Sequence, residues 1–131
     1  MRIERLGPDD VDRVAAAEAL FDDAIDVGTT RAFLADERHH LLIAVDGGSP
    51  AGFVTGVELF HPDKPGPEMF LYELGVDEAF RGRGIGRALW RRSRRSPGNV
   101  AATPCGCSPT MTTRPRWRHI APPAAGASPD R

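Results

Sequence analysis

The stretch LYELGVDEAFRGRGIGRAL, residues 71–89, joins an apolar strand, a glycine-rich loop and the start of a helix. Gly82, Gly84 and Gly86 alternate in the loop, and glycines let a backbone turn its N–H groups toward one point without Cβ clashes. The positive end of the helix dipole adds to the attraction for an anion. Three arginines flank the same loop: Arg81, Arg83 and Arg87. The stretch therefore predicts a binding site for an anion of pyrophosphate size.

The glycine spacing does not fit either of two common nucleotide-binding motifs. A P-loop needs Gly-Lys followed by Ser or Thr, and these residues are missing after Gly86. The dinucleotide fingerprint follows the first strand of its domain, whereas this loop follows the third long strand. The loop alone thus indicates an anion and leaves its identity open.

The residues before the loop predict an α+β sheet with helices packed against it. The helical period and N-terminal signals indicate helices over residues 7–24 and 30–37. A short strand is expected over 3–6, a hairpin of two strands over 39–48 and 49–61, and a third long strand over 68–78. With the helix after the loop, the order is β-α-α-β-β-β-α, an α+β arrangement.

Charge divides the chain of 131 residues into two unequal parts. Residues 1–80 carry 17 acidic and 6 basic side chains, whereas residues 81–131 carry 11 arginines and one acid. Seven of the 12 prolines lie from Pro97 onward, without a helical or strand period. Such a switch is typical of a single domain followed by a disordered tail. With no leader or membrane span legible, a cytoplasmic protein is expected.

Several other polar side chains have plain structural interpretations. His39, His40 and His61 are expected at the surface or at strand edges, and the Tyr72 ring is expected in the core. Cys105 and Cys107 are too close in sequence to be probable disulfide partners and lack a second ligand pair for zinc. No metal site is therefore predicted.

The stretch 71–89 resembles motif A of the GNAT superfamily of acetyl-CoA-dependent N-acetyltransferases. Arg81, Gly84 and Gly86 fall on the Arg/Gln-x-x-Gly-x-Gly/Ala positions of that motif. The resemblance covers residues 1 to about 92, and outside motif A it rests on element order. Within the superfamily, FLYELGV (70–76) most resembles the aminoglycoside 3-N-acetyltransferase branch, in which an acidic residue follows an aromatic one on this strand.

The resemblance implies a GNAT-like, mostly antiparallel mixed sheet flanked by helices and a site for acetyl-CoA. The pyrophosphate of the coenzyme would lie on the loop from Gly82 through Arg83, Gly84 and Ile85 to Gly86, beside Arg81. The pantetheine arm would pair with the preceding strand, as an added strand does. The strand residues concerned are Leu74, Gly75 and Val76.

Glu73 is the candidate catalytic base for transfer of the acetyl group to an amine. The amine must be neutral to attack the thioester, and a nearby group must take its proton. Burial beside Tyr72 and Leu74 would raise the pKa of the Glu73 carboxyl toward the working range. A strand carboxylate facing solvent is the alternative interpretation.

The resemblance also implies a small-molecule amine as acceptor, with an aminoglycoside as one choice. Acidic residues gather around the first two helices, which border the acceptor cleft in this family: Asp22, Asp23, Asp26, Asp36 and Glu37. They would attract a polycationic acceptor, or they simply form a solvated helical face. No nucleic-acid or membrane partner is expected, and the oligomeric state is open, a homodimer included.

The pattern of the family ends near Arg92, and a shifted reading frame explains this. Combining the last base of each codon with the first two of the next, residues 100–125 permit GCDAMWVLTDDDNPAALATYRSAGG, a typical GNAT ending. Met111 followed by Thr112 must give Asp in this frame. We therefore divide the chain into the N-terminal part of a GNAT domain, 1–92, and an out-of-frame, disordered tail, 93–131.

The shifted tail would remove the family's next strand and the tyrosine that commonly protonates the leaving thiolate. The C-terminal third of the domain would then be missing, and the chain would be an acetyltransferase of doubtful activity. One alternative is an inactive remnant with weak coenzyme A binding. A lower-ranked alternative is a nucleic-acid-binding protein with a basic tail, whose DNA binding would fall steeply with salt and need residues 93–131.

Resequencing the gene across the codons for residues 89–100 tests the frameshift. We expect the reading frame to change near Arg91–Ser93 in the direction of one lost base. A base restored by the new read would give a complete acetyltransferase. The interpretation would be contradicted if the new read repeated the present sequence and the second frame did not encode a GNAT-like ending.

Overall fold

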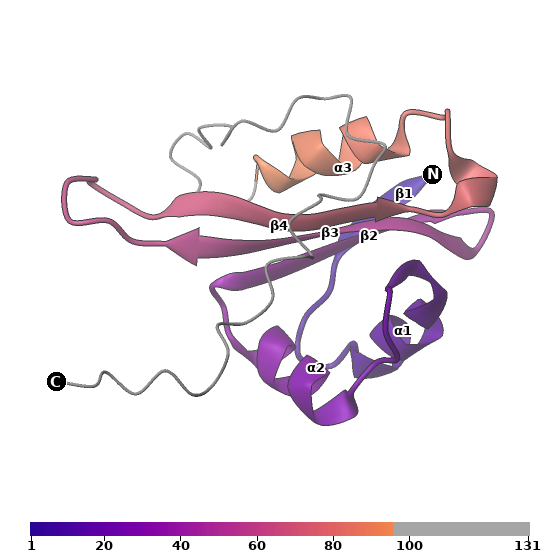
Figure 1. Ribbon diagram of the computed structural model, residues 1–131, viewed down its shortest axis with the longest axis horizontal. Coiled ribbons are helices and arrows are strands. Elements are labelled where there is room, and N and C mark those ends of the chain that lie inside the picture. Colours follow the sequence, from indigo (N-terminus) through magenta and orange to yellow (C-terminus); the bar gives the residue numbers. More distant parts are fainter. Residues whose placement is uncertain (96–131) are drawn as a thin grey trace, which may run out of the picture.

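The computed structural model describes residues 1–95, which form one antiparallel sheet with helices on both faces (Figure 1). The strands are β1 (Arg2–Arg5), β2 (His39–Asp46), β3 (Ser49–Leu59) and β4 (Glu68–Val76), in the order β1-β2-β3-β4. The helices are α1 (Val11–Ala16), α2 (Val27–Ala35) and α3 (Ile85–Ser93), with short 3-10 turns η1 (Glu18–Leu20) and η2 (Glu78–Phe80). This confirms the predicted α+β class and the order of the main elements.

The first helix is shorter than the sequence pattern predicts. The α-helix stops at Ala16, and the chain tightens into η1 before it becomes extended at Phe21. This change of path carries the Phe21 ring onto Phe53 of the sheet, with ring centroids 4.3 Å apart. Packing against the sheet thus overrides the helical propensity of the alanine-rich segment.

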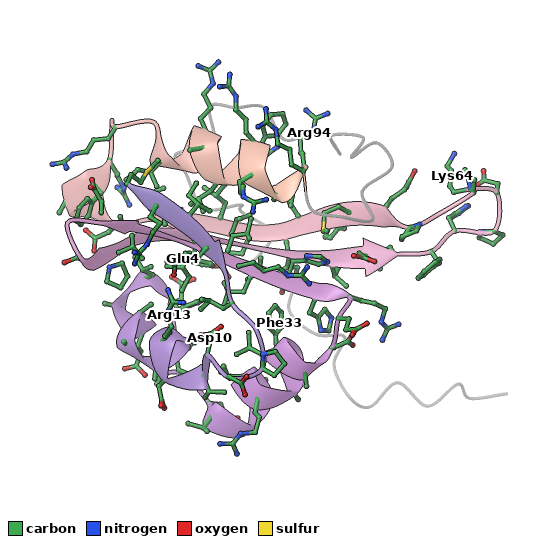
Figure 2. The ribbon with its side chains drawn as sticks, turned by 180° about the vertical axis from the view of Figure 1, so that it is seen from behind. Glu4, Asp10, Arg13, Phe33, Lys64 and Arg94 are labelled. Carbon is green, nitrogen blue, oxygen red and sulfur yellow. The ribbon has the colours of Figure 1, made fainter. Side chains whose placement is uncertain are left out.

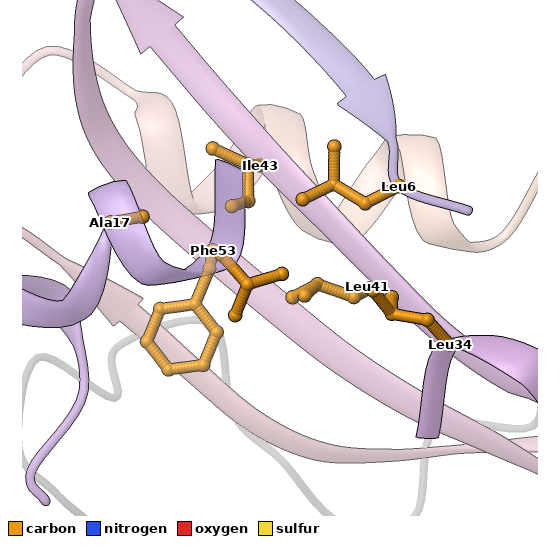
Figure 3. Close-up of a cluster of buried hydrophobic side chains, with 7 residues drawn as sticks. Leu6, Ala17, Leu34, Leu41, Ile43 and Phe53 are labelled. Carbon is orange, nitrogen blue, oxygen red and sulfur yellow. The ribbon is translucent and has the colours of Figure 1, made fainter. Parts of the chain in front are cut away.

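Two apolar cores lie on opposite faces of the sheet because side chains alternate along each strand. Leu41 and Ile43 of β2 point toward α1 and α2, while Leu42 and Ala44 point toward α3. Figure 3 shows the first core, whose buried members are Leu6, Val14, Ala17, Leu34, Leu41, Ile43 and Phe53. In the second, α3 contributes two side chains that lie against strands β2 and β3: Ile85 and Leu89.

The β2–β3 hairpin confirms the predicted glycine turn. Asp46 pairs with Ser49, and the two residues between them, Gly47 and Gly48, have φ angles of 58° and 81°. Positive φ at both central positions is the geometry that matches the right-handed twist of paired strands. The turn therefore fixes the register of the two central strands.

A charged cluster joins α1 to the edge strand (Figure 2). Arg13 of α1 forms an ion pair with Glu4 of β1, and its guanidinium also lies 3.6 Å from an Asp10 carboxylate oxygen. Arg13 is exposed and the two carboxylates are partly exposed, so the cluster adds little to the stability supplied by the apolar core. It orients the short β1 strand relative to α1.

His40 corrects the prediction that the histidines lie at the surface or at strand edges. Its side chain is only 4% exposed, and Nε2 lies 2.8 Å from Oε1 of Glu58. Within residues 1–95, Nδ1 of His40 has no hydrogen-bond partner. Burial is the main cause that lowers the pKa of the imidazole, against the opposing effect of Glu58. The neutral ring with hydrogen on Nε2 is therefore the form that donates to Glu58.

The predicted tail, 93–131, falls outside the described residues from residue 96 onward. Within the described part, α3 extends to Ser93, and no helix is long and apolar enough to cross a membrane. The frameshift, the tail and the two cysteines stay predictions from sequence.

We expect acid to destabilise the fold through His40. Because folding lowers the pKa of this imidazole, the unfolded chain takes up more protons as pH falls below about 6.5. The free energy of unfolding, measured by urea denaturation, should decrease from pH 7.5 to pH 5.5. His40→Gln, which keeps a donor for Glu58 and cannot titrate, should flatten this dependence.

His61→Gln is the matched control, since the His61 side chain is 65% exposed. It should retain the pH dependence of the unmodified chain. An unchanged slope in His40→Gln would contradict the role of this buried ring.

Candidate functional site

The connection from β4 to α3 is held by a cap and two left-handed glycines. The carboxylate of Asp77 accepts a hydrogen bond of 2.8 Å from the N–H of Ala79. Asp77 is thereby the N-cap of η2. Gly82 and Gly84 have φ angles of 79° and 78°, a conformation that other residues rarely adopt. Gly84 is the N-cap of α3, so the second left-handed turn leads directly into the helix.

A row of backbone N–H groups in this connection lacks acceptors. In the described part of the chain, no atom accepts a hydrogen bond from the N–H groups of residues 82–87. The first bond of α3 runs from the N–H of Ala88 to the carbonyl of Gly84, at 3.0 Å. Free N–H groups at a helix N-terminus after a glycine loop form a site for a phosphate-type anion.

The flanking arginines lie close to the loop, and two of them are already in contact with other groups. Nε of Arg81 donates to the carbonyl of Val76 at 3.4 Å. The guanidinium of Arg83 lies 3.5 Å from a carboxylate oxygen of Asp46 and 5.3 Å from the centre of the Phe80 ring. All three predicted arginines, Arg81, Arg83 and Arg87, are exposed. Their charges therefore border the N–H groups without being buried.

The predicted loop residues can offer backbone N–H groups to an anion, while the side chain of one of them, Ile85, lies in the core. Ile85 is 2% exposed and packs in the second core, so only its N–H group can reach an anion. A Cβ atom on Gly86 would lie 3.4 Å from Leu74 and 3.6 Å from Val76. The start of α3 thus lies against the end of β4, and the loop and strand form one continuous surface.

The end of β4 turns backbone groups away from the sheet. The N–H of Asp77 donates to the carbonyl of Ala51 at 2.9 Å. Because backbone groups alternate in direction along an antiparallel strand, Gly75 then faces β3, while Leu74 and Val76 face outward. β4 is the last strand of the sheet that the structure describes. The outward N–H and C=O of Leu74 and the N–H of Val76 are suited to pair with an extended ligand, whereas the Val76 carbonyl already accepts from Arg81.

An irregularity in the β3–β4 pairing places two polar side chains on the same face. Thr55 pairs with Glu73 and Gly56 pairs with Leu71, so Tyr72 is an extra residue in β4. By this register, Thr55 and Glu73 share the face covered by α1 and α2. An extra residue of this kind bends a strand and redirects its side chains.

The surroundings of Glu73 differ from the prediction. Tyr72 is 55% exposed and Leu74 is 39% exposed, so the expectation of a core tyrosine is wrong. Tyr72 lies on β4, the outer strand of the described sheet, and its ring lines an open hollow there instead of filling the core. Glu73 itself is partly buried. Tyr72 and Leu74 therefore do not enclose the Glu73 carboxylate in an apolar environment.

A hollow of about 230 Å³ lies on the same face of the sheet. Its walls come from α2, the start of β2 and the irregular part of the β3–β4 pair: Phe33, His39, Thr55, Gly56, Val57 and Tyr72. Phe33 projects from α2 toward the sheet (Figure 2) and stacks on the His39 ring with centroids 5.0 Å apart. Sequence reasoning missed Phe33 and Thr55, because only the long-range register brings them beside β4.

The acidic residues of the first two helices are not brought together as one cluster. Asp26 caps the start of α2 through the N–H of Thr29 at 2.6 Å, and this hydrogen bond lowers the pKa of its carboxyl. Asp36 lies beyond the other end, where hydrogen bonds from Arg38 lower the pKa of its carboxyl to about 2. Each of these two carboxylates thus accepts hydrogen bonds from residues close to it in sequence. Among residues 1–95, no group of three or more His, Cys, Asp or Glu side chains could hold a metal.

Comparison with known proteins agrees with this geometry. The sequence profile described as "Acetyltransferase (GNAT) family" matches residues 10–95, while no curated protein matches the chain. An aminoglycoside acetyltransferase from an uncultured soil metagenomic sample is similar in structure, with a TM-score of 0.64 and 23% sequence identity. The match covers 71% of this chain and 68% of that one.

Two further solved structures share the fold. Another aminoglycoside acetyltransferase from an uncultured soil metagenomic sample, in complex with sisomicin, has a TM-score of 0.63 and 24% identity, over 71% of this chain and 66% of that chain. A ribosomal-protein-alanine N-acetyltransferase from Brucella melitensis biovar Abortus 2308 has a TM-score of 0.60 and 25% identity, over 70% and 67%. The chain spans about two thirds of the length of each of the three structures.

Arg83→Gln tests whether the loop is an anion site. We expect affinity for inorganic pyrophosphate, measured by isothermal titration calorimetry at low salt, to fall about tenfold, since a charge-assisted hydrogen bond is lost. Arg91→Gln removes the same charge from the last turn of α3. This control should bind nearly as well as the unmodified chain, and equal losses in both variants would indicate a general charge effect instead.

Proposed function

We propose that this chain, which belongs to the acetyltransferase (GNAT) family, transfers an acetyl group from acetyl-CoA to a primary amine of a small molecule. The observation that carries the proposal is the row of acceptor-free N–H groups over residues 82–87, beside the outward backbone groups of Leu74 and Val76. Members of this family are N-acetyltransferases, and the matched region, 10–95, contains both features.

The described residues fit acetyl-CoA in two places. The N–H groups of residues 83–86 would hold the pyrophosphate, with the helix dipole of α3 and the nearby guanidiniums opposing its charge. The outward groups of Leu74 and Val76 would pair with the amide-containing pantetheine arm, and Gly75 between them faces β3. Together these contacts would place the thioester along the end of β4, next to Glu73.

The reaction requires one bond to form and one to break. The neutral amine attacks the thioester carbon, the new C–N bond forms, and the C–S bond breaks to release the thiolate of coenzyme A. Glu73 takes the proton of the attacking amine, directly or through one water. Its partly buried place beside Thr55 supports this role, which does not depend on a core environment for Tyr72.

An aminoglycoside is the acceptor class that we propose within the small-molecule amines. The support is the resemblance of residues 70–76 to the aminoglycoside 3-N-acetyltransferase branch, together with two similar structures that are aminoglycoside acetyltransferases. On this proposal, the chain would act on an antibiotic in the cytoplasm. A homodimer is compatible with it.

An inactive remnant that binds coenzyme A is the second candidate, favoured by one observation. The chain contains a single tyrosine, Tyr72, which precedes the proposed base on β4. The family's thiolate-protonating tyrosine is expected later in the domain, in the segment predicted to be out of frame. Release of free thiol from acetyl-CoA with kanamycin, against a thermal shift with coenzyme A alone, separates the two candidates.

Glu73→Gln should slow acetyl transfer about 10²-fold to 10⁴-fold, because the amide cannot accept the proton of the amine. The affinity for coenzyme A, measured by calorimetry, should change little, since the change is isosteric and lies outside the anion loop. Glu68→Gln makes the same change at the start of β4 and should retain activity. Full activity of Glu73→Gln would exclude the carboxylate as the base.

A further inference from the structure

We propose that the hollow between α2 and the β3–β4 pair binds one aminated ring of the acceptor, and that Thr55 donates or accepts the hydrogen bond that selects a polar substituent on that ring. The inference deepens the proposed function and rests on it for the reaction, although binding of the ring can be tested without turnover.

The walls of the hollow suit the flat face of a ring. Phe33 and His39 stack almost in parallel, with an angle of 5° between their planes, and Tyr72 lies on another side. Gly56 and Val57 of β3 also line it. Ligand sites combine such apolar and aromatic walls with a small number of polar groups that fix orientation.

The size of the hollow limits the occupant to a small group. Its volume of about 230 Å³ lies below the ~300–1,000 Å³ of sites that enclose a drug-sized ligand. One ring fits this space, and the remainder of a larger acceptor would extend away from β4. A linear polyamine lacks the flat apolar face that these walls would cover.

Thr55 supplies the polar group of the site. Its Oγ1 atom is buried and has no hydrogen-bond partner within residues 1–95, an arrangement that folded proteins usually avoid. No hydrogen bond therefore holds the side chain in its present rotamer. Thr55 lines the hollow, and rotation about its Cα–Cβ bond would bring the hydroxyl to face a bound ring.

The register connects this hydrogen bond to the chemistry. Thr55 is the direct cross-strand partner of Glu73, and paired residues on one face have Cβ atoms about 4.5–5.5 Å apart. A ring substituent bound by Thr55 would therefore bring the neighbouring ring amine beside the Glu73 carboxylate. The geometry favours acceptors in which an amine and a hydroxyl, or two amines, occupy adjacent ring carbons.

Three probes separate ring, substituent and charge: trans-2-aminocyclohexanol, cyclohexylamine and spermidine. Their affinities can be measured by NMR titration of the full chain without coenzyme A, following the amide signals of Phe33, Thr55 and Tyr72. We expect the aminocyclohexanol to bind about fivefold more tightly than cyclohexylamine, the effect of one hydrogen bond. Spermidine should leave these signals unshifted.

Thr55→Val removes the hydroxyl and keeps the shape of the side chain. It should bring the affinity ratio of the two ring amines to about one, while Thr55→Ser should keep the ratio. Thr29→Val, at an exposed position of α2, is the control for a general effect of the substitution. If Thr55→Val does not fold, Thr55→Ser and the three probes still test the site.

The outcomes distinguish this inference from the proposed function. An unchanged ratio in Thr55→Val, or shifts from spermidine equal to those from the ring amines, would overturn the inference. Failure of both ring amines to shift the three signals at millimolar concentration would overturn it as well. Ring binding without acetyl transfer would support the subsite and contradict the activity, whereas transfer without these shifts would support only the activity.

Discussion

The close approach of α3 to β3 is the constraint on which the site depends. A Cβ atom on Gly52 would lie 2.8 Å from the carbonyl oxygen of Gly75 and 3.3 Å from side-chain atoms of Ile85 and Leu89. Only a residue without a side chain leaves room there for strand and helix together. Because Ile85 opens α3, this contact fixes where the helix begins and hence where its unpaired N–H groups lie.

Because of the extra residue in β4, this strand contributes to two proposed ligand surfaces. After it, Leu74 and Val76 direct backbone groups outward beside the anion loop. At it, the consecutive residues Tyr72 and Glu73 both face α1 and α2, and Glu73 pairs with Thr55. One local irregularity therefore places the proposed coenzyme contacts and the proposed acceptor contacts next to each other.

The sequence predicts those turns and helix ends whose conformation depends only on neighbouring residues. The paired glycines after Asp46 specify the hairpin turn, and Gly84 before Ile85 specifies a left-handed entry into α3. The site beyond the loop depends on long-range register, which no local pattern contains. The burial of His40 and the exposure of Tyr72 therefore differ from the prediction, because each depends on which strands and helices pack beside it in the fold.

The acceptor-free N–H groups also couple anion binding to the packing of α3 against the sheet. They are brought together only while Ile85 and Leu89 lie in the second core, so an anion that binds them stabilises the docked helix by mass action. The amides of α3 should then exchange with deuterium more slowly in the presence of pyrophosphate, with less change in β1 at the far edge. A bound anion would thus supply part of the stability of α3, the last helix of the described chain.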